Sequence, residues 1–177
     1  MNRTLFAAAL AGVAVISFEA RGQIAPKSVQ FGIAAGAAIP TSDLSNTTNT
    51  GFNVTGVLGF QPDMIPLGVR IDGAYNQFSR KGGGANAHFT SVTGNLVYKI
   101  PSTSVSPYLI GGAGWYNTAV SVTGGGTASE NDFGWSLGGG ITLPLSGFET
   151  FIEARYNQVQ VTGGSLKFIP ITFGIMF

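Results

Sequence analysis

After residue 27, the sequence is divided into segments of about ten residues in which apolar and polar side chains alternate. In the first segment, for example, Phe31 and Ile33 share one face and Gly32 lies on the other. Because successive side chains of a strand point to opposite faces, a period of two predicts β-strands with one apolar and one small or polar face. We count eight such segments, of which the fifth, residues 107–121, is Gly-rich and leaves the facing of its residues undecided.

The composition decides where the apolar faces point. Only 10% of the residues are charged, against about 25% in typical soluble proteins. These charged side chains are too few to cover the outer surface of eight strands in water. The apolar faces are therefore expected to contact lipid. Strands that cross a membrane must close on themselves because no water satisfies their edges. The predicted fold is therefore all-β, an eight-stranded antiparallel up-and-down transmembrane β-barrel whose narrow lumen is filled by side chains.

The first 22 residues have the layout of a cleavable signal peptide. A short start with Arg3 precedes an apolar core, and the small residues Ala20 and Gly22 follow it. The core is too short for a membrane-spanning helix. We therefore expect a signal peptide at 1–22, export of the chain, and a barrel domain at 23–177.

Four charged residues occupy the alternate strand positions whose side chains are expected to face the lumen. Arg70 and Asp72 lie on the third segment, and Glu153 and Arg155 lie on the seventh, which is opposite it in an eight-stranded ring. An unpaired buried charge is costly, so we expect a neutral network of two acids and two bases. Such a network is interpreted as a plug, with a gated pore or proton path as the alternative.

Aromatic residues cluster toward the segment ends, where rings are expected to lie at the level of the lipid headgroups. The residues concerned are Phe52, Phe60, Tyr75, Phe78, Tyr98, Tyr108, Phe133, Trp135, Phe148 and Phe168.

The connections between segments differ in length and composition. Those near 61–66, 100–106 and 144–148 are short and contain Pro, whereas those near 40–51, 79–87, 122–131 and 161–167 are rich in Gly, Ser, Thr and Asn. Transmembrane β-barrels carry short turns at one end and longer loops at the other, and the longer loops are expected on the outer side. In the second outer loop, Arg80 and Lys81 are candidates for contact with lipopolysaccharide phosphates, or else are solvated surface charges.

Other chemistry finds little support. With nine basic and eight acidic residues, the chain lacks the basic surface of a nucleic-acid-binding protein, and the absence of Cys excludes a disulfide framework. No catalytic residue, cofactor site or metal site is expected, although the loop acids Asp43, Glu130 and Asp132 are weak Ca²⁺ candidates. His88 lies near Ser91 in sequence, so a hydrolase triad is conceivable, but a polar residue at the barrel rim is the favoured interpretation.

Three stretches resemble small OmpA/OmpX-like bacterial outer-membrane β-barrels, namely PYLIGGAG at 107–114, FIEARY at 151–156 and IPITFGIMF at 169–177. The resemblance covers the whole mature chain. It implies a barrel in the bacterial outer membrane with both termini in the periplasm. It also implies that Phe177 resembles the carboxyl-end signal read by the barrel-assembly machinery.

The function predicted from this resemblance is a structural or surface-interaction role in the envelope, with outer-membrane lipid, lipopolysaccharide and an extracellular surface molecule as candidate partners. The alternatives are an adhesin or host-interaction barrel, a lipid-A-modifying barrel enzyme and a small gated pore. A soluble lipocalin-like barrel would invert the faces and place Phe31, Ile71 and Phe173 inside.

Overall fold

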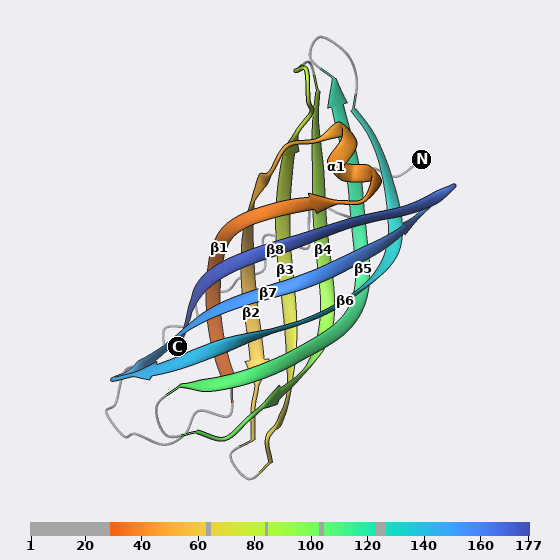
Figure 1. The fold of residues 1–177 in the computed structure, drawn as a ribbon. Coiled ribbons are helices and arrows are strands. Elements are labelled where there is room, and N and C mark those ends of the chain that lie inside the picture. Colours follow the sequence, from red (N-terminus) through yellow and green to blue (C-terminus); the bar gives the residue numbers. More distant parts are fainter. Residues whose placement is uncertain (1–28, 63–64, 84, 103–104, 123–126) are drawn as a thin grey trace.

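The chain forms one closed barrel in the computed structural model, which describes residues 29–62, 65–83, 85–102, 105–122 and 127–177 (Figure 1). Each strand pairs antiparallel with its neighbour in sequence, and the last strand pairs with the first. The structure thus confirms the eight-stranded up-and-down barrel. The signal peptide predicted at 1–22 lies outside the described residues.

The strands follow one another with short connections, apart from one helix between the first two. The elements are β1 (Val29–Thr41), α1 (Asp43–Thr47), β2 (Gly51–Phe60), β3 (Leu67–Ser79), β4 (Ala85–Lys99), β5 (Ser106–Val122), β6 (Thr127–Leu145), β7 (Phe148–Val161) and β8 (Gly164–Met176). Within the described ranges, no helix has the length and apolar character needed to cross a membrane.

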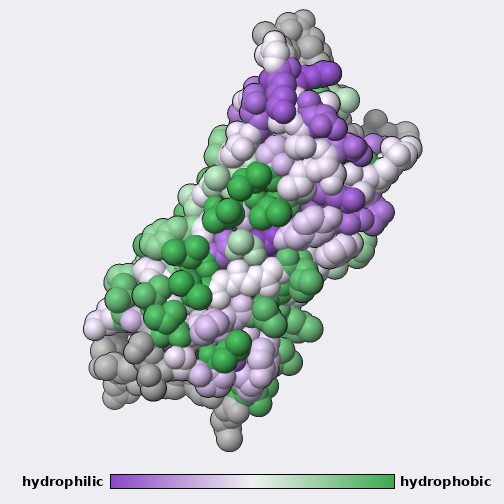
Figure 2. All heavy atoms as spheres, in the orientation of Figure 1, coloured by the Kyte–Doolittle hydropathy of each residue, from purple (hydrophilic) through white to green (hydrophobic). Residues whose placement is uncertain are grey.

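The alternation of polarity matches the alternation of exposure. Ile33, Ile71 and Phe173 are 59%, 54% and 54% exposed on the outer surface, whereas their strand neighbours Ala34, Asp72 and Thr172 are buried in the lumen. Figure 2 shows hydrophobic residues over much of the barrel wall and hydrophilic residues gathered toward the end that carries α1, which we call the α1 end. The soluble-barrel alternative is wrong because its interior residues lie outside.

Three of the ten aromatic residues expected at headgroup level lie in the lumen instead. Phe78, Tyr108 and Phe168 are 0%, 3% and 1% exposed. Phe78 shares its parity with Asp72, and Phe168 shares its parity with Thr172, so both point inward like these polar residues. The fifth strand proves to point Tyr108 inward and Leu109 outward, which settles its undecided facing.

Three connections differ from the sequence prediction. The loop predicted at 161–167 is reduced to a two-residue turn, because residues 164–167 belong to β8 and pair with β7. The stretch predicted as a loop at 122–131 is mostly strand, because residues 127–132 continue β6 and pair with β5. The predicted turn at 144–148 is reduced to a tight turn, since Pro144 pairs with Glu149 within the β6–β7 ladder. The helix α1 was not predicted at all.

Candidate functional site

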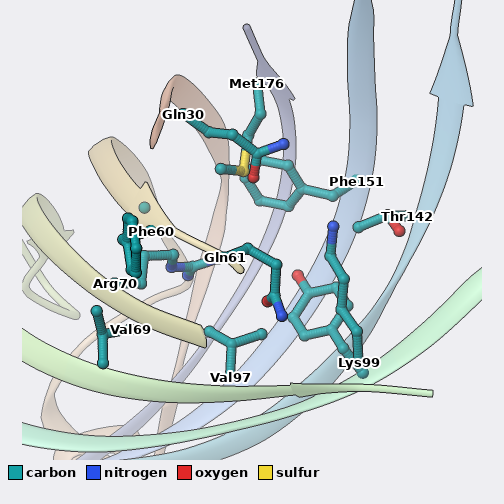
Figure 3. A pocket seen from close by; sticks show the side chains of 12 residues that line it. Gln30, Phe60, Gln61, Val69, Arg70, Val97, Lys99, Thr142, Phe151 and Met176 are labelled. Carbon is teal, nitrogen blue, oxygen red and sulfur yellow. The ribbon is translucent and has the colours of Figure 1, made fainter. Parts of the chain in front are cut away.

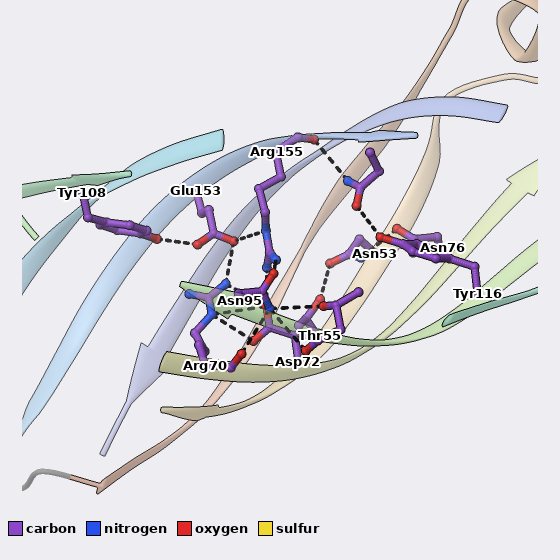
Figure 4. Close-up of polar contacts among 12 residues, drawn as sticks. Asn53, Thr55, Arg70, Asp72, Asn76, Asn95, Tyr108, Tyr116, Glu153 and Arg155 are labelled. Carbon is purple, nitrogen blue, oxygen red and sulfur yellow. Dashed lines mark hydrogen bonds and ion pairs between the residues drawn. The ribbon is translucent and has the colours of Figure 1, made fainter. Parts of the chain in front are cut away.

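The four interior charges lie within contact distance of one another across the lumen (Figure 4). On β3, Nε of Arg70 lies 2.9 Å from Oδ1 of Asp72, and on β7, Nε of Arg155 lies 2.7 Å from Oε1 of Glu153. Between the two strands, Nη2 of Arg70 lies 2.8 Å from Glu153, and Nη2 of Arg155 lies 2.6 Å from Asp72. These residues, which we call the charge cluster, form a ring of alternating sign with no net charge.

Neutral side chains complete the charge cluster. The hydroxyl of Tyr108 donates to Oε2 of Glu153 at 2.7 Å, and the amide of Asn95 donates to Oδ2 of Asp72 at 3.1 Å. Arg155 in turn donates to the amide oxygen of Asn95 at 3.3 Å. Buried ionic groups are tolerated when they are paired and hydrogen-bonded. These contacts meet that condition except at Oδ1 of Asp72, which is paired with Arg70 but accepts no hydrogen bond within the described residues. Asn95 has lumen parity in the sequence, but nothing in the Gly-rich fifth segment indicated the role of Tyr108.

Toward the α1 end, the lumen is closed by an aromatic layer formed by Phe78, Phe89 and Phe168. The three ring centroids lie 5.3 to 5.6 Å apart. Tyr116 and Val159 pack against them, and all five side chains are buried. Aromatic pairs at such separations add packing energy to the area that they bury. A small cavity between the charge cluster and this layer is lined by residues of both.

The helix α1 covers the aromatic layer. Leu44 of α1 belongs to the same buried cluster as the three Phe rings. The connection between β3 and β4 holds the helix in place, since Nζ of Lys81 donates to the carbonyl of Ser45 at 2.7 Å. The backbone N–H of Lys81 donates to the carbonyl of Thr47, and that of Asn49 donates to the carbonyl of Ser79. Loop and helix therefore form one cap.

A pocket at the opposite end of the lumen reaches the other side of the charge cluster (Figure 3). Val97, Phe151 and Met176 give it apolar walls, and the guanidinium of Arg70 lies over the ring of Phe151, 5.7 Å from its centroid. Lys99 also lines this pocket and forms an ion pair of 2.9 Å with Glu149. Both cations of the pocket are therefore already paired with carboxylates.

The other residues singled out in the sequence are dispersed. Arg80 is exposed next to Lys81, whose amine is engaged by α1, so contact of this pair with lipopolysaccharide stays a prediction. Phe177 is 53% exposed, and its backbone forms two hydrogen bonds with Phe31 that extend the β1–β8 pairing to the last residue. Its role as an assembly signal also stays a prediction.

The structure separates the residues of the conceivable hydrolase triad. Ser91 is buried in the lumen, whereas His88 lies on the outer face of the same strand, with Nδ1 2.6 Å from the hydroxyl of Tyr75. In the described part of the chain, no three His, Asp or Glu side chains gather closely enough to hold a metal ion. One of the Ca²⁺ candidates, Asp132, instead accepts a hydrogen bond from Thr118.

The model of the outer membrane protein beta-barrel domain matches residues 5–177, and the chain belongs to this family of bacterial outer-membrane proteins. Among solved structures, Neisserial surface protein A (NspA) superposes with a TM-score of 0.71 at 17% identity, covering 84% of this chain and 96% of that one. Ail, the attachment invasion locus protein of Yersinia pestis, gives a TM-score of 0.50 at 23% identity, covering 84% and 98%. The outer membrane enzyme PagL gives 0.51 at 18% identity, covering 82% and 97%.

A comparison with curated proteins gives no match. At such low identities, the structural likenesses establish a shared fold, and one that a surface protein and an outer membrane enzyme both adopt. The resemblance to small outer-membrane barrels noted in the sequence is confirmed.

Proposed function

We propose that the protein is a non-catalytic, non-conducting barrel that serves as a structural and surface-presenting component of the outer membrane. The observation that carries this proposal is the charge cluster, which occupies the middle of the lumen with every charge paired. The aromatic layer and the cap formed by α1 add a second closure on the same path. The separation of His88 from Ser91 by the barrel wall supports a role without hydrolysis.

The proposal includes an orientation. We place the α1 end outside the cell, because the longest connection, residues 42–50, and the polar extensions of β5 and β6 beyond the apolar wall lie there, as the extracellular loops of bacterial barrels do. Both termini of the mature barrel are then periplasmic. The hydrophilic surface gathered near α1 in Figure 2 would be the part presented to the surroundings of the cell.

Substitution of Glu153 by Gln tests the plug. The change keeps the shape of the side chain but leaves Arg70 and Arg155 facing Asp72 alone, which we expect to destabilise the folded barrel by about 3–5 kcal/mol without opening a conducting path. Urea titration followed by gel mobility of the folded form measures the stability, and planar-bilayer recording measures the conductance.

Tyr108→Phe is the matched control, since it removes one hydrogen bond to Glu153 and no charge. It should cost roughly 1.5–3 kcal/mol and remain silent in recordings. Well-resolved channel openings in Glu153→Gln would instead identify the charge cluster as a gate and contradict the proposed function.

A further inference from the structure

Strands β3 and β7 share a short repeated sequence. Residues 71–78 are IDGAYNQF and residues 152–159 are IEARYNQV, so Ile, Tyr, Asn and Gln recur at the same spacing and Glu replaces Asp. The two strands are four places apart in the ring of eight, and therefore lie on opposite sides of the barrel. Outward-facing Tyr75 and Gln77 on β3 have their counterparts in Tyr156 and Gln158 on β7.

The neighbouring strands extend this likeness into two similar surface sites. Gln77 is paired in register with Phe52 on one side and with His88 on the other. Gln158 is likewise paired with Trp135 and with Lys167. Each site therefore holds an aromatic residue, a Tyr, a Gln and a basic residue, and we name the sites by the basic one. The His88 site comprises Phe52, Tyr75, Gln77 and His88, and the Lys167 site comprises Trp135, Tyr156, Gln158 and Lys167.

The internal contacts of the two sites also correspond. The rings of Phe52 and Tyr75 lie 5.9 Å apart at 44°, and those of Trp135 and Tyr156 lie 5.7 Å apart at 48°. In both sites, the Tyr hydroxyl donates to the side-chain oxygen of the Gln two residues along, at 3.1 Å and 3.4 Å. Each Gln amide is thereby oriented by its oxygen, and its NH₂ group has no protein partner among the described residues.

The basic groups add further donors. The amine of Lys167 has neither an ion pair nor a hydrogen bond within the described residues, and no carboxylate compensates it there. In the His88 site, the Tyr75 hydroxyl gives its hydrogen to Gln77 and therefore accepts a hydrogen bond from Nδ1 of His88, which leaves Nε2 as the ring nitrogen available to another molecule. The Lys167 site thus offers amide and ammonium N–H groups beside an aromatic surface, and the His88 site offers amide N–H groups and, in the imidazolium form, the N–H of Nε2.

Both sites lie where the outer surface changes from apolar to polar. From Tyr75 toward the start of β3, away from the α1 end, the outward residues are Gly73, Ile71 and Val69, and beyond Gln77 toward α1 comes Ser79. On β8, Lys167 precedes the outward Ile169 and Ile171. Aromatic residues at such a border lie at the level of the lipid headgroups.

We propose that the His88 and Lys167 sites are two equivalent binding sites for the phosphorylated headgroup of a membrane lipid. Phosphate oxygens would accept hydrogen bonds from the Gln amide and the basic group, and the aromatic pair would lie against the start of the acyl region. With the α1 end outside, an orientation that rests on the proposed function, the lipid would be that of the outer leaflet.

Native mass spectrometry of the detergent-refolded barrel, loaded with bisphosphorylated lipid A, tests the sites by counting retained lipids. We expect two per barrel for the unaltered chain, one for His88→Gln, one for Lys167→Gln and none for the double variant. Lys167→Arg should restore the second lipid. Lys99→Gln is the charge-matched control, since it removes a cation at the opposite end, and it should retain two.

A parallel loading with phosphatidylglycerol distinguishes the source of the phosphate. Retention of lipid A alone supports lipopolysaccharide as the ligand, and equal retention of both supports headgroup phosphate in general. Two lipids retained by the double variant, or a loss in Lys99→Gln, would overturn the proposal. A conducting barrel would contradict the proposed function and leave these lipid counts unchanged, so the two failures are distinguishable.

Discussion

Gly36 is the residue on which the closing seam of the barrel depends most directly. It lies on β1 in register with Thr172 of β8, and a Cβ there would overlap the carbonyl oxygen of Ile171 and the backbone of Thr172. Glycine within a strand often marks such a close approach of two backbones. The missing side chain therefore permits β1 and β8 to approach closely where the two ends of the sheet meet.

We expect Gly36→Ala to reduce the yield of folded barrel severalfold, because the seam cannot widen without loss of β1–β8 hydrogen bonds. Gly73→Ala is the matched control, since no atom lies within 4 Å of the position its Cβ would occupy. The folded fraction is measured by the difference in gel mobility between unboiled and boiled samples. Equal folded fractions for the two variants would show that the seam accommodates a methyl group.

At the scale of elements, α1 is a cap on the lumen rather than a part of the barrel wall. Leu44 anchors it to the aromatic layer, while every strand pairing is independent of it. Loss of this anchor should therefore release the cap without unfolding the barrel. In Leu44→Ser, we expect hydrogen exchange of residues 43–49 to accelerate at least tenfold and the midpoint of barrel unfolding to stay unchanged.

Asn46→Ala is the control for the cap, because Asn46 is exposed on the same helix. It should leave hydrogen exchange near its original rate. A large loss of barrel stability in Leu44→Ser would show that the cap and the wall unfold as one unit.

The strands could be predicted from the sequence because alternation reports directly which side chains face lipid. The aromatic layer was missed because position along the segment was given more weight than parity for Phe78 and Phe168. Tyr108 was wrongly placed at headgroup level, since the glycines that follow it carry no polarity signal that would reveal its facing. The extension of β6 was missed for a different reason. Residues 127–132 continue the strand past the apolar wall, where neither face contacts lipid, so apolar and polar residues no longer alternate.

For the whole molecule, the orientation in the membrane is the property with the widest consequences. The chain contains no Cys, so a single introduced Cys reports accessibility without background. Thr162 and Ser146 offer a matched pair, because each is exposed in a tight turn before a glycine with positive φ, one at the α1 end and one at the opposite end. On intact cells, a membrane-impermeant maleimide should label Thr162→Cys and spare Ser146→Cys.

Permeabilisation of the outer membrane should then expose Ser146→Cys as well. The reverse pattern on intact cells would show that the α1 end faces the periplasm. The α1 cap would then be periplasmic, and the His88 and Lys167 sites would lie at the inner leaflet of the outer membrane.

The pairing within the charge cluster has a consequence for biogenesis. Arg70 and Asp72 neutralise each other on one strand, and Glu153 and Arg155 do so on another, before either pair meets its partner across the lumen. A strand that carries its own counter-ion enters the bilayer as an electrically neutral unit, whereas a lone arginine at membrane depth would cost several kcal/mol. The charges of the cluster therefore do not constrain the order in which β3 and β7 arrive, and the cluster is completed only when the ring has closed.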